Sequence, residues 1–211
     1  MITVAIQAGG RSSRMGRDKA LLQLGGITLI EHVLRTVDGL GDEVLITTNR
    51  PEAYEFLGKR MVEDRQPGAG ALHGLLTALE AARGERILLL GCDMPFVNRD
   101  LLQHMLGITT EAEVVIPRRG GKFQPLHAIY AKSCAGPVRQ SLEADERRMI
   151  SFFPHIQTWI VEQETLDRYD PEGLSFFNAN TPEELAHAEQ LLGGGNSRGS
   201  TAAPEPSTTP P

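Results

Sequence analysis

The alternation of short apolar runs with longer amphipathic segments limits the fold of this chain most. Short apolar runs bounded by glycine or charged residues predict buried strands, and apolar residues at i, i+3, i+4 and i+7 predict helices. The strands are expected at 2–6, 43–48, 60–63, 86–92, 113–117, 124–131 and 158–161. The helices are expected at 28–40, 51–57, 133–144 and 182–192, with two more around the leucines of 72–79 and 101–106.

This order predicts an α/β fold, a doubly wound and mostly parallel sheet with helices on both faces. The run at 86–92 is the most apolar, so we expect it near the centre of the sheet. Local capping signals support three of the helix starts: Thr28 with Glu31, Asn98, and Thr181 with Glu184. Ligands of such sheets bind beyond the carboxyl ends of the strands, which makes the loops after the strands informative.

Length and composition restrict the organisation of the chain. Residues 1–192 are expected to form one domain, and residues 193–211, which include no large apolar side chain, a disordered tail. The formal net charge of −6 argues against a nucleic-acid partner, although not against a small anion in a local basic pocket. No apolar run approaches the roughly 20 residues that cross a bilayer, and no signal-peptide pattern opens the chain. With its two cysteines far apart, the chain fits a cytoplasmic protein without membrane contact.

The first expected strand leads directly into a loop rich in glycine and basic residues. It reads Q-A-G-G-R-S-S-R-M-G-R-D-K from Gln7 to Lys19. Glycine lets backbone N–H groups approach an anion, and arginine and lysine supply donors for phosphate oxygens. The spacing matches neither a Walker A loop nor G-x-G-x-x-G. The loop predicts phosphate binding, with a glycine-rich turn on a solvated cationic surface as the alternative.

Two basic side chains of this loop are candidate phosphate ligands. Lys19 is long enough to reach an α-phosphate and stabilise the charge that develops there. A lysine at a helix start is unfavourable beside the positive helix end unless an anion is bound, which favours this role over a solvated lysine. Arg14 fits phosphate contact and simple solvation equally well.

Two acids at strand ends are candidates for metal and nucleotide binding. Asp93, in G-C-D-M-P-F, ends the most apolar strand, where an acid must be solvated, paired or bound to a metal. Beside a phosphate loop the natural metal is Mg²⁺, which proteins hold with one or two carboxylates plus substrate phosphates. The alternative for Asp93 is a cap ahead of Pro95. Asp64 fits a ribose or base contact or the outer shell of the metal, with a surface acid paired to Arg65 as the alternative.

Other reactive side chains fit structural roles. The six histidines include no H-x-x-x-H pair, so a metal site built on them is not expected. Cys92 lies in an apolar run and fits a small core residue better than a nucleophile. Arg147 and Arg148 fit a solvated helix face, with a site for a second anionic substrate as the alternative.

The loop and several later segments together resemble the Rossmann-like nucleotidyltransferases, and the loop ending R-M-G-x-D-K is similar to that of the molybdenum cofactor guanylyltransferases. The other segments similar to motifs of that family are G-A-G-A-L-H-G-L (68–75), G-C-D-M-P-F (91–96), Q-P-L-H-A-I-Y (124–130), E-R-R-M (146–149) and F-F-N-A-N-T-P-E-E-L (176–185). The resemblance covers nearly all of the chain up to residue 192.

The resemblance implies transfer of GMP from GTP to the terminal phosphate of molybdopterin, with pyrophosphate leaving. The nucleotide-binding residues that it implies are Gln7, Ala8, Gly9, Gly10, Lys19, Asp64 and Asp93. The implied catalytic residues are Lys19 and Asp93, with Asp93 as the Mg²⁺ ligand, and the composition of the loop adds Arg14 to them. The implied partners are GTP and molybdopterin, with transient contacts to other proteins of molybdenum cofactor biosynthesis or to acceptor enzymes.

One departure from the family pattern concerns the choice of nucleotide. Gln7 stands where the family usually has an apolar residue, and a side-chain amide near the base could alter nucleotide selection.

The alternatives to a GTP-dependent enzyme are a CTP-dependent cytidylyltransferase, a sugar-phosphate nucleotidyltransferase, and a nucleotide-binding module without turnover.

Overall fold

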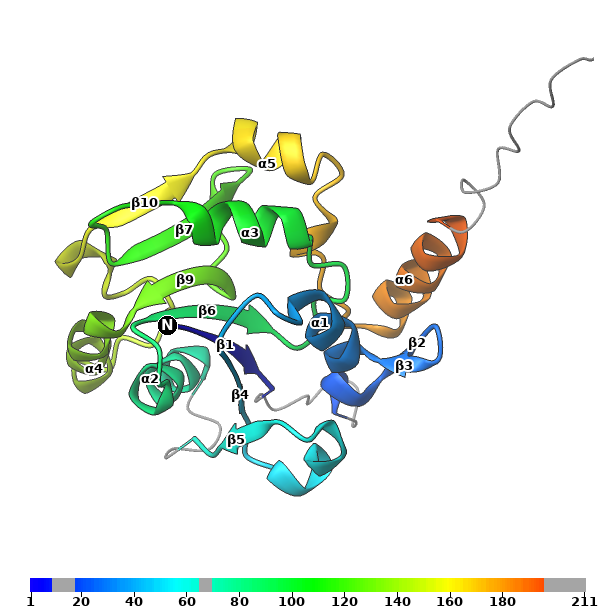
Figure 1. Ribbon diagram of the computed structural model, residues 1–211, viewed down its shortest axis with the longest axis horizontal. Helices are drawn as coiled ribbons and strands as arrows, with labels where there is room; N and C mark the ends of the chain where they lie inside the picture. Colours follow the sequence, from blue (N-terminus) through cyan, green and yellow to red (C-terminus); the bar gives the residue numbers. More distant parts are fainter. Residues whose placement is uncertain (9–17, 65–69, 196–211) are drawn as a thin grey trace, which may run out of the picture.

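A computed structural model describes residues 1–8, 18–64 and 70–195 of the chain. Within them, the main sheet has the strand order β10-β7-β9-β6-β1-β4-β5, with β8 paired to β7 (Figure 1). Its strands are β1 (Ile2–Gln7), β4 (Glu43–Thr47), β5 (Arg60–Val62), β6 (Arg86–Gly91), β7 (Val114–Arg119), β8 (Lys122–Phe123), β9 (His127–Ala131) and β10 (Thr158–Val161). β9 runs antiparallel to β6 and β7, and β8 to β7, whereas the other pairs are parallel. The predicted mostly parallel sheet is confirmed, with β6 at its centre.

Helices cover both faces of this sheet, as predicted (Figure 1). They are α1 (Leu29–Val37), α2 (Ala71–Ala81), α3 (Arg99–Gly107), α4 (Ala135–Glu143), α5 (Gln163–Tyr169) and α6 (Pro182–Gly195). α2 and α4 pack with Ala5 and Leu89 in one core cluster, and α1, α3 and α5 pack with Val4 and Leu88 in another. Successive residues of β1 and β6 therefore point to opposite faces, and both faces are apolar because both are covered.

The predicted helix caps are present. The Thr28 N–H donates to Glu31 Oε2 at 2.8 Å in a capping box at the start of α1. Asn98 Oδ1 accepts a backbone N–H of α3 at 2.9 Å. At the start of α6, the Glu184 N–H donates to Thr181 Oγ1 at 3.2 Å. These local signals place three of the helix starts correctly.

Some elements differ from the prediction. α5 was not expected, because only Leu166 of its seven residues is buried and no apolar period marks it. The expected helix at 51–57 is a pair of 3-10 turns, η2 (Pro51–Ala53) and η3 (Glu55–Leu57). A hairpin of β2 (Gln23–Leu24) and β3 (Ile27–Thr28) was also missed, since its strands are too short to show alternation.

The C-terminal helix packs on this hairpin and continues past its expected end. Leu24 of β2 and Ala188 of α6 belong to one small apolar cluster. α6 ends at Gly195 rather than at residue 192. Residues 196–211 lie outside the described residues, so the disordered tail stays a prediction.

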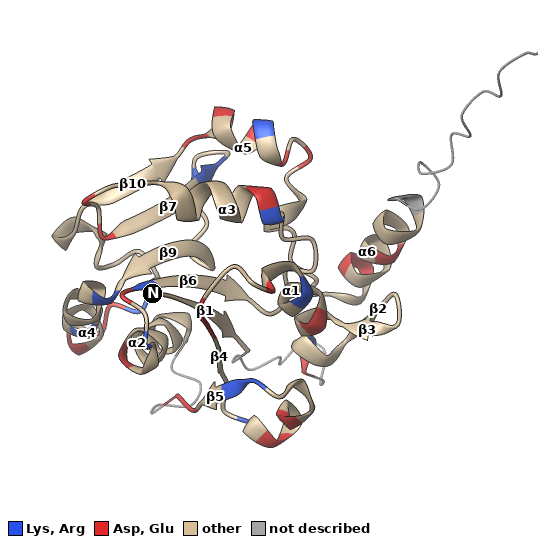
Figure 2. Ribbon diagram, viewed as in Figure 1, with Lys and Arg blue, Asp and Glu red and all other residues tan. Residues whose placement is uncertain are grey.

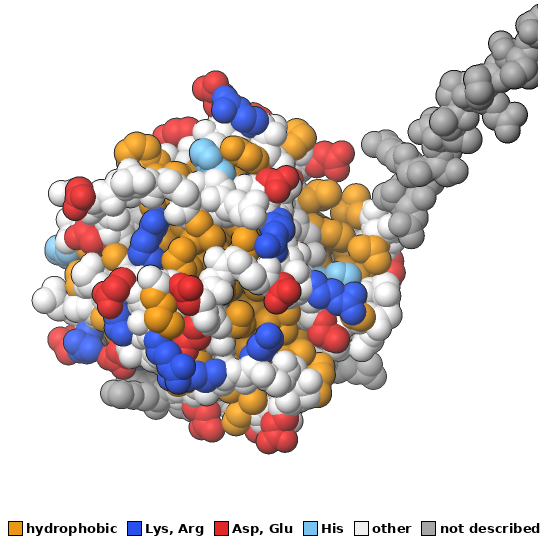
Figure 3. Space-filling model, in the orientation of Figure 1, with side chains coloured by type: hydrophobic (Ala, Val, Ile, Leu, Met, Phe, Trp, Pro, Cys, Tyr) orange, Lys and Arg blue, Asp and Glu red, His pale blue; other side chains and the backbone are white. Residues whose placement is uncertain are grey.

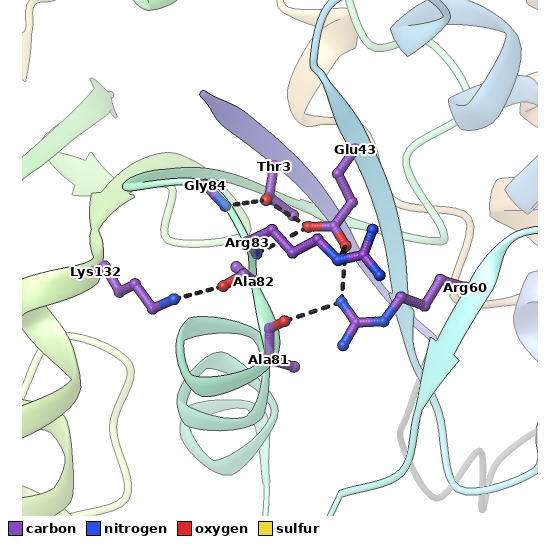
Figure 4. Close-up of polar contacts among 8 residues, drawn as sticks. All are labelled: Thr3, Glu43, Arg60, Ala81, Ala82, Arg83, Gly84 and Lys132. Carbon is purple, nitrogen blue, oxygen red and sulfur yellow. Dashed lines mark hydrogen bonds and ion pairs between the residues drawn. The ribbon is translucent and has the colours of Figure 1, made fainter.

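Glu43 links the amino ends of several elements (Figure 4). Its carboxylate accepts hydrogen bonds from Thr3 Oγ1 at 2.8 Å, Arg60 Nη1 at 2.7 Å and the Arg83 N–H at 2.9 Å. Burial raises the pKa of Glu43, but these hydrogen bonds outweigh burial and leave the pKa below its ordinary value. The cluster stabilises the edge of the sheet opposite the carboxyl ends of β1, β4 and β6.

Charged side chains of both signs are intermingled over the face of the molecule in view, with apolar side chains between them (Figure 3). Acidic residues mark α6 (Figure 2). Within the described ranges, no helix is both long and apolar enough to span a membrane.

Candidate active site

The carboxyl ends of β1, β4 and β6 form the edge at which the predicted site residues should meet. Gln7 lies opposite Thr47 of β4 and Gly91 of β6. The Ala8 N–H donates to the Thr47 carbonyl at 2.9 Å, and the Cys92 N–H donates to the Gln7 carbonyl at 3.2 Å. This backbone pairing fixes where the chain leaves β1 toward the glycine-rich loop.

Lys19 is the first residue of a short 3-10 helix, η1 (Lys19–Leu21). Its Nζ donates a hydrogen bond to Asn180 Oδ1 at 2.6 Å. Asn180 lies just before α6, where its own N–H donates to Glu184 Oε2 at 2.7 Å. Asn180 was not among the predicted site residues. The N-A-N-T-P segment of the last family motif was the signal that could have identified it.

Asp93 lies two residues beyond the end of β6. Its carbonyl accepts the Ala179 N–H at 3.0 Å, which brings the segment before α6 to this strand end. Burial raises the pKa of the Asp93 carboxyl, and its own N–H and the charge of Lys19 oppose this effect in part. The structure therefore brings Lys19 and Asp93 to one segment before α6, through Asn180 and Ala179 respectively, although their catalytic roles stay predictions.

The surroundings of Asp93 fit a metal held partly by substrate. Among the described residues, no three Asp, Glu, His or Cys side chains gather into a complete metal site. Asp93 Oδ1 lies over Gly91, where a Cβ would come within 2.9 Å of that oxygen. A single partly buried carboxylate suits an ion that takes its other ligands from phosphates and water.

Asp64 follows β5 and is held between two neighbouring elements. Its N–H donates to Asn49 Oδ1 at 3.2 Å, and its Oδ1 accepts a hydrogen bond from Thr77 Oγ1 of α2 at 3.3 Å. Both contacts hold Asp64 between the segment that follows β4 and α2. The alternative partner, Arg65, lies outside the described residues.

The side chain of Gln7 points toward α2. Its Nε2 donates to the Ala71 carbonyl at 3.1 Å, and only 7% of the residue is exposed. Within the described part of the chain, Gln7 Oε1 and Thr47 Oγ1 are buried without a hydrogen-bond partner. The amide nitrogen of Gln7 is thus committed to the start of α2, while its oxygen stays unpaired.

Known proteins are similar to this chain over most of its length. The family model described as a MobA-like NTP transferase domain matches residues 4–158. A probable molybdenum cofactor guanylyltransferase of Pelotomaculum thermopropionicum is 37% identical over 189 residues, which are 90% of this chain and 92% of the relative.

The chain belongs to the MobA-like NTP transferase family.

A second relative and a solved structure also resemble this MobA-like chain over most of its length. A probable molybdenum cofactor guanylyltransferase of Carboxydothermus hydrogenoformans is 36% identical over 195 residues, covering 90% of this chain and 95% of the relative. The crystal structure of molybdopterin-guanine dinucleotide biosynthesis protein A from Archaeoglobus fulgidus matches with a TM-score of 0.78 at 27% identity. That match covers 91% of this chain and 99% of the other. The resemblance inferred from the motifs is confirmed, and the chain is a nucleotidyltransferase.

Part of the predicted MobA-like site lies outside the described residues. Gly9, Gly10 and Arg14 fall within 9–17, so their predicted phosphate contacts stay predictions. Cys92 is packed against the apolar core, and burial raises its pKa well above the ordinary value, which agrees with a core role rather than a nucleophilic one. Arg147 Nε pairs with Asp145 Oδ1 at 2.8 Å on an exposed turn.

Proposed function

We propose that this chain transfers GMP from GTP to the terminal phosphate of molybdopterin and releases pyrophosphate. The observation that carries this proposal is that Lys19 and Asp93 contact adjacent residues, Asn180 and Ala179, beyond the carboxyl end of β6, where parallel sheets bind their ligands. The names of the two bacterial relatives support GTP and molybdopterin as the substrates.

The residues given to GTP binding in this proposal are Gln7, Ala8, Gly9, Gly10, Lys19, Asp64 and Asp93. Lys19 binds the α-phosphate, and Arg14 supplies a second phosphate donor. A fixed ammonium group contributes most where negative charge develops in the transition state. The remaining work of the protein is to align the attacking phosphate with the α-phosphorus.

Asp93 would hold the divalent metal that nucleotidyltransferases generally use, and we propose Mg²⁺. When bound, the ion neutralises phosphate charge and acts as a Lewis acid. Asp93 contributes an ionised carboxylate at the end of β6. The neighbouring charge of Lys19 favours that ionised form against the effect of burial.

Two soluble substrates, rather than a nucleic acid, are the partners in this proposal. The product would pass in the cytoplasm to other proteins of molybdenum cofactor biosynthesis or to an acceptor enzyme.

The test is pyrophosphate release by the purified full chain with Mg²⁺ and molybdopterin, with GTP and CTP measured in parallel. We expect release with GTP and at most a small fraction of that rate with CTP. Release with CTP alone would keep the chemistry and overturn the choice of base. Release with neither nucleotide from folded protein would overturn the proposal, and sugar phosphates would then be tested as acceptors.

A further inference from the structure

The hydroxyl of Tyr54, a buried residue, donates a hydrogen bond to Asp18, which directly precedes Lys19. Asp18 Oδ2 accepts a hydrogen bond from Tyr54 Oη at 2.5 Å and also pairs with the Arg50 guanidinium. The other carboxylate oxygen, Oδ1, accepts the Ala20 N–H at 3.2 Å. Asp18 is therefore bound on one side to the segment between β4 and β5 and on the other to η1.

Tyr54 is a rigid anchor for this contact. It lies between the turns η2 and η3, is completely buried, and belongs to the core cluster shared with Ala20. Burial, followed by the hydrogen bond to Asp18, raises the pKa of Tyr54 above its ordinary value. The phenol therefore keeps its proton and donates to Asp18 throughout the physiological pH range.

The contact sets the start of η1, which carries Lys19. The Asp18 carbonyl accepts the Leu21 N–H at 3.1 Å, so Asp18 caps the turn with both its side chain and its backbone. Ala20 is fully buried directly after Lys19. With its neighbours fixed on both sides, the backbone of Lys19 is held in place, and its Nζ donates a hydrogen bond to Asn180.

We infer that Tyr54 is a positioning residue that acts through Asp18 to direct the Lys19 ammonium group toward the end of β6. This inference rests on the proposed role of Lys19 in phosphate binding. A long, flexible lysine side chain loses effectiveness when its supporting contacts are removed, since catalysis depends on holding groups in place.

The variant that tests this is Tyr54→Phe, which keeps the ring and removes only the hydroxyl. Tyr130→Phe is a matched control, because Tyr130 is also fully buried and its hydroxyl also donates one hydrogen bond, to the Pro125 carbonyl at 2.7 Å. We expect Tyr54→Phe to lower kcat about tenfold with KM for GTP changed less than about twofold, since a misplacement of about 1 Å can cost up to about 100-fold. Tyr130→Phe should stay within about twofold of the parent chain.

A double-mutant cycle separates positioning from a general structural effect. In a Lys19→Ala background, Tyr54→Phe should lower kcat by no more than about twofold further, because its effect passes through the missing ammonium group. A tenfold loss in both backgrounds would overturn the inference. Asp18→Asn provides a second variant at the other end of the contact, in case Tyr54→Phe melts too low to be assayed.

A readout that needs no turnover distinguishes failure of this inference from failure of the proposed function. Amine acylation followed by mass spectrometry reports the reactivity of Lys19, with Lys59 and Lys122 as internal references. We expect Tyr54→Phe, but not Tyr130→Phe, to change Lys19 reactivity by at least about threefold, as expected for a released side chain. An unchanged reactivity together with an unchanged kcat refutes the inference, whereas a changed reactivity in a protein that releases no pyrophosphate refutes only the proposed function.

Discussion

The side chain of Gln7 fills the space that a side chain at residue 74 would need. A Cβ placed on Gly74 would lie 2.0 Å from Gln7 Nε2 and 2.6 Å from its Cδ. Gln7 is at the end of β1 and Gly74 is in α2, so a glycine in the helix lets the strand carry a large amide at the ligand edge.

Gly74→Ala should therefore destabilise the protein, although alanine is the better helix former. We expect the free energy of unfolding to fall by about 1–3 kcal/mol, because overpacking outweighs the gain of about 1 kcal/mol in helix propensity. Urea denaturation measures this. Gly136→Ala in α4, where a Cβ meets nothing within 4 Å, should be neutral or stabilising. The double variant Gln7→Ala with Gly74→Ala should recover part of the loss, and strict additivity would contradict the explanation.

Glu43→Gln should lower stability without affecting turnover. The substitution leaves Arg60 and the Arg83 N–H beside a neutral group in a cluster where the Glu43 side chain is only 7% exposed. Loss of a partly buried charge with several donors costs about 2–4 kcal/mol, whereas a surface pair costs about 0–1 kcal/mol. Glu162→Gln, whose side chain is 55% exposed beside Arg118, is the control. Equal losses of unfolding free energy in the two variants would show that the Glu43 cluster stabilises the protein no more than an exposed ion pair does.

His127 should make the protein less stable in mild acid. The residue is completely buried on β9, with its ring centroid 4.9 Å from that of Phe176. Burial lowers the pKa of His127 from 6.5 to about 4, although the charge of Asp170 opposes this. Between these pH values the unfolded chain takes up a proton on His127 and the folded chain does not. The contribution of neutral His127 to the free energy of unfolding is therefore fully present above pH 6.5 and is lost as the pH falls toward 4. The loss is about 3 kcal/mol at about 1.4 kcal/mol per pKa unit.

Urea denaturation at several pH values between 7 and 4 checks this prediction. His127→Leu should flatten the dependence in that window, whereas His155→Asn, at an exposed position, should leave it as in the parent chain. An equally steep loss of stability in His127→Leu would assign the effect to other groups.

Asp93→Ala should remove nearly all turnover, because it removes the proposed metal ligand. We expect Asp93→Asn to lower kcat by about 100-fold or more, since the amide keeps the shape but not the charge. Both variants should remain folded, because neutralising a carboxyl with a raised pKa relieves a cost of burial. Asp167→Ala, on the exposed side of α5, is the control for pyrophosphate release. Retained activity in Asp93→Ala would exclude the assignment of Asp93 as metal ligand.

Sequence reasoning succeeded where the determining contacts are local. Thr28 and Glu31, or Asn98 and its helix, lie within one turn of each other, so their residue types alone predict the caps. The direction of β9 could not be predicted in this way, because an apolar run reads the same in parallel and antiparallel strands. Its direction depends on the short connection through β8, which returns the chain beside β7.

The same distinction applies to the site. Lys19 and Asp93 are predicted as site residues individually, from a loop composition and from a strand end. Their common partner segment is not, because Asn180 is separated from Lys19 by 161 residues and no local pattern connects them. Tyr54 was overlooked for a similar reason: its hydroxyl acts on a residue 36 positions earlier, and a buried tyrosine looks like any other core residue in sequence.

The hydrogen bond between Lys19 and Asn180 makes this active site a late product of protein synthesis. A ribosome must translate past Asn180 before Lys19, at the start of η1, can make this hydrogen bond. Chains interrupted between β10 and α6 would retain every described strand of the sheet yet lack the contact between Lys19 and Asn180. The contact between Lys19 and Asn180 is therefore restricted to chains whose synthesis has passed Asn180.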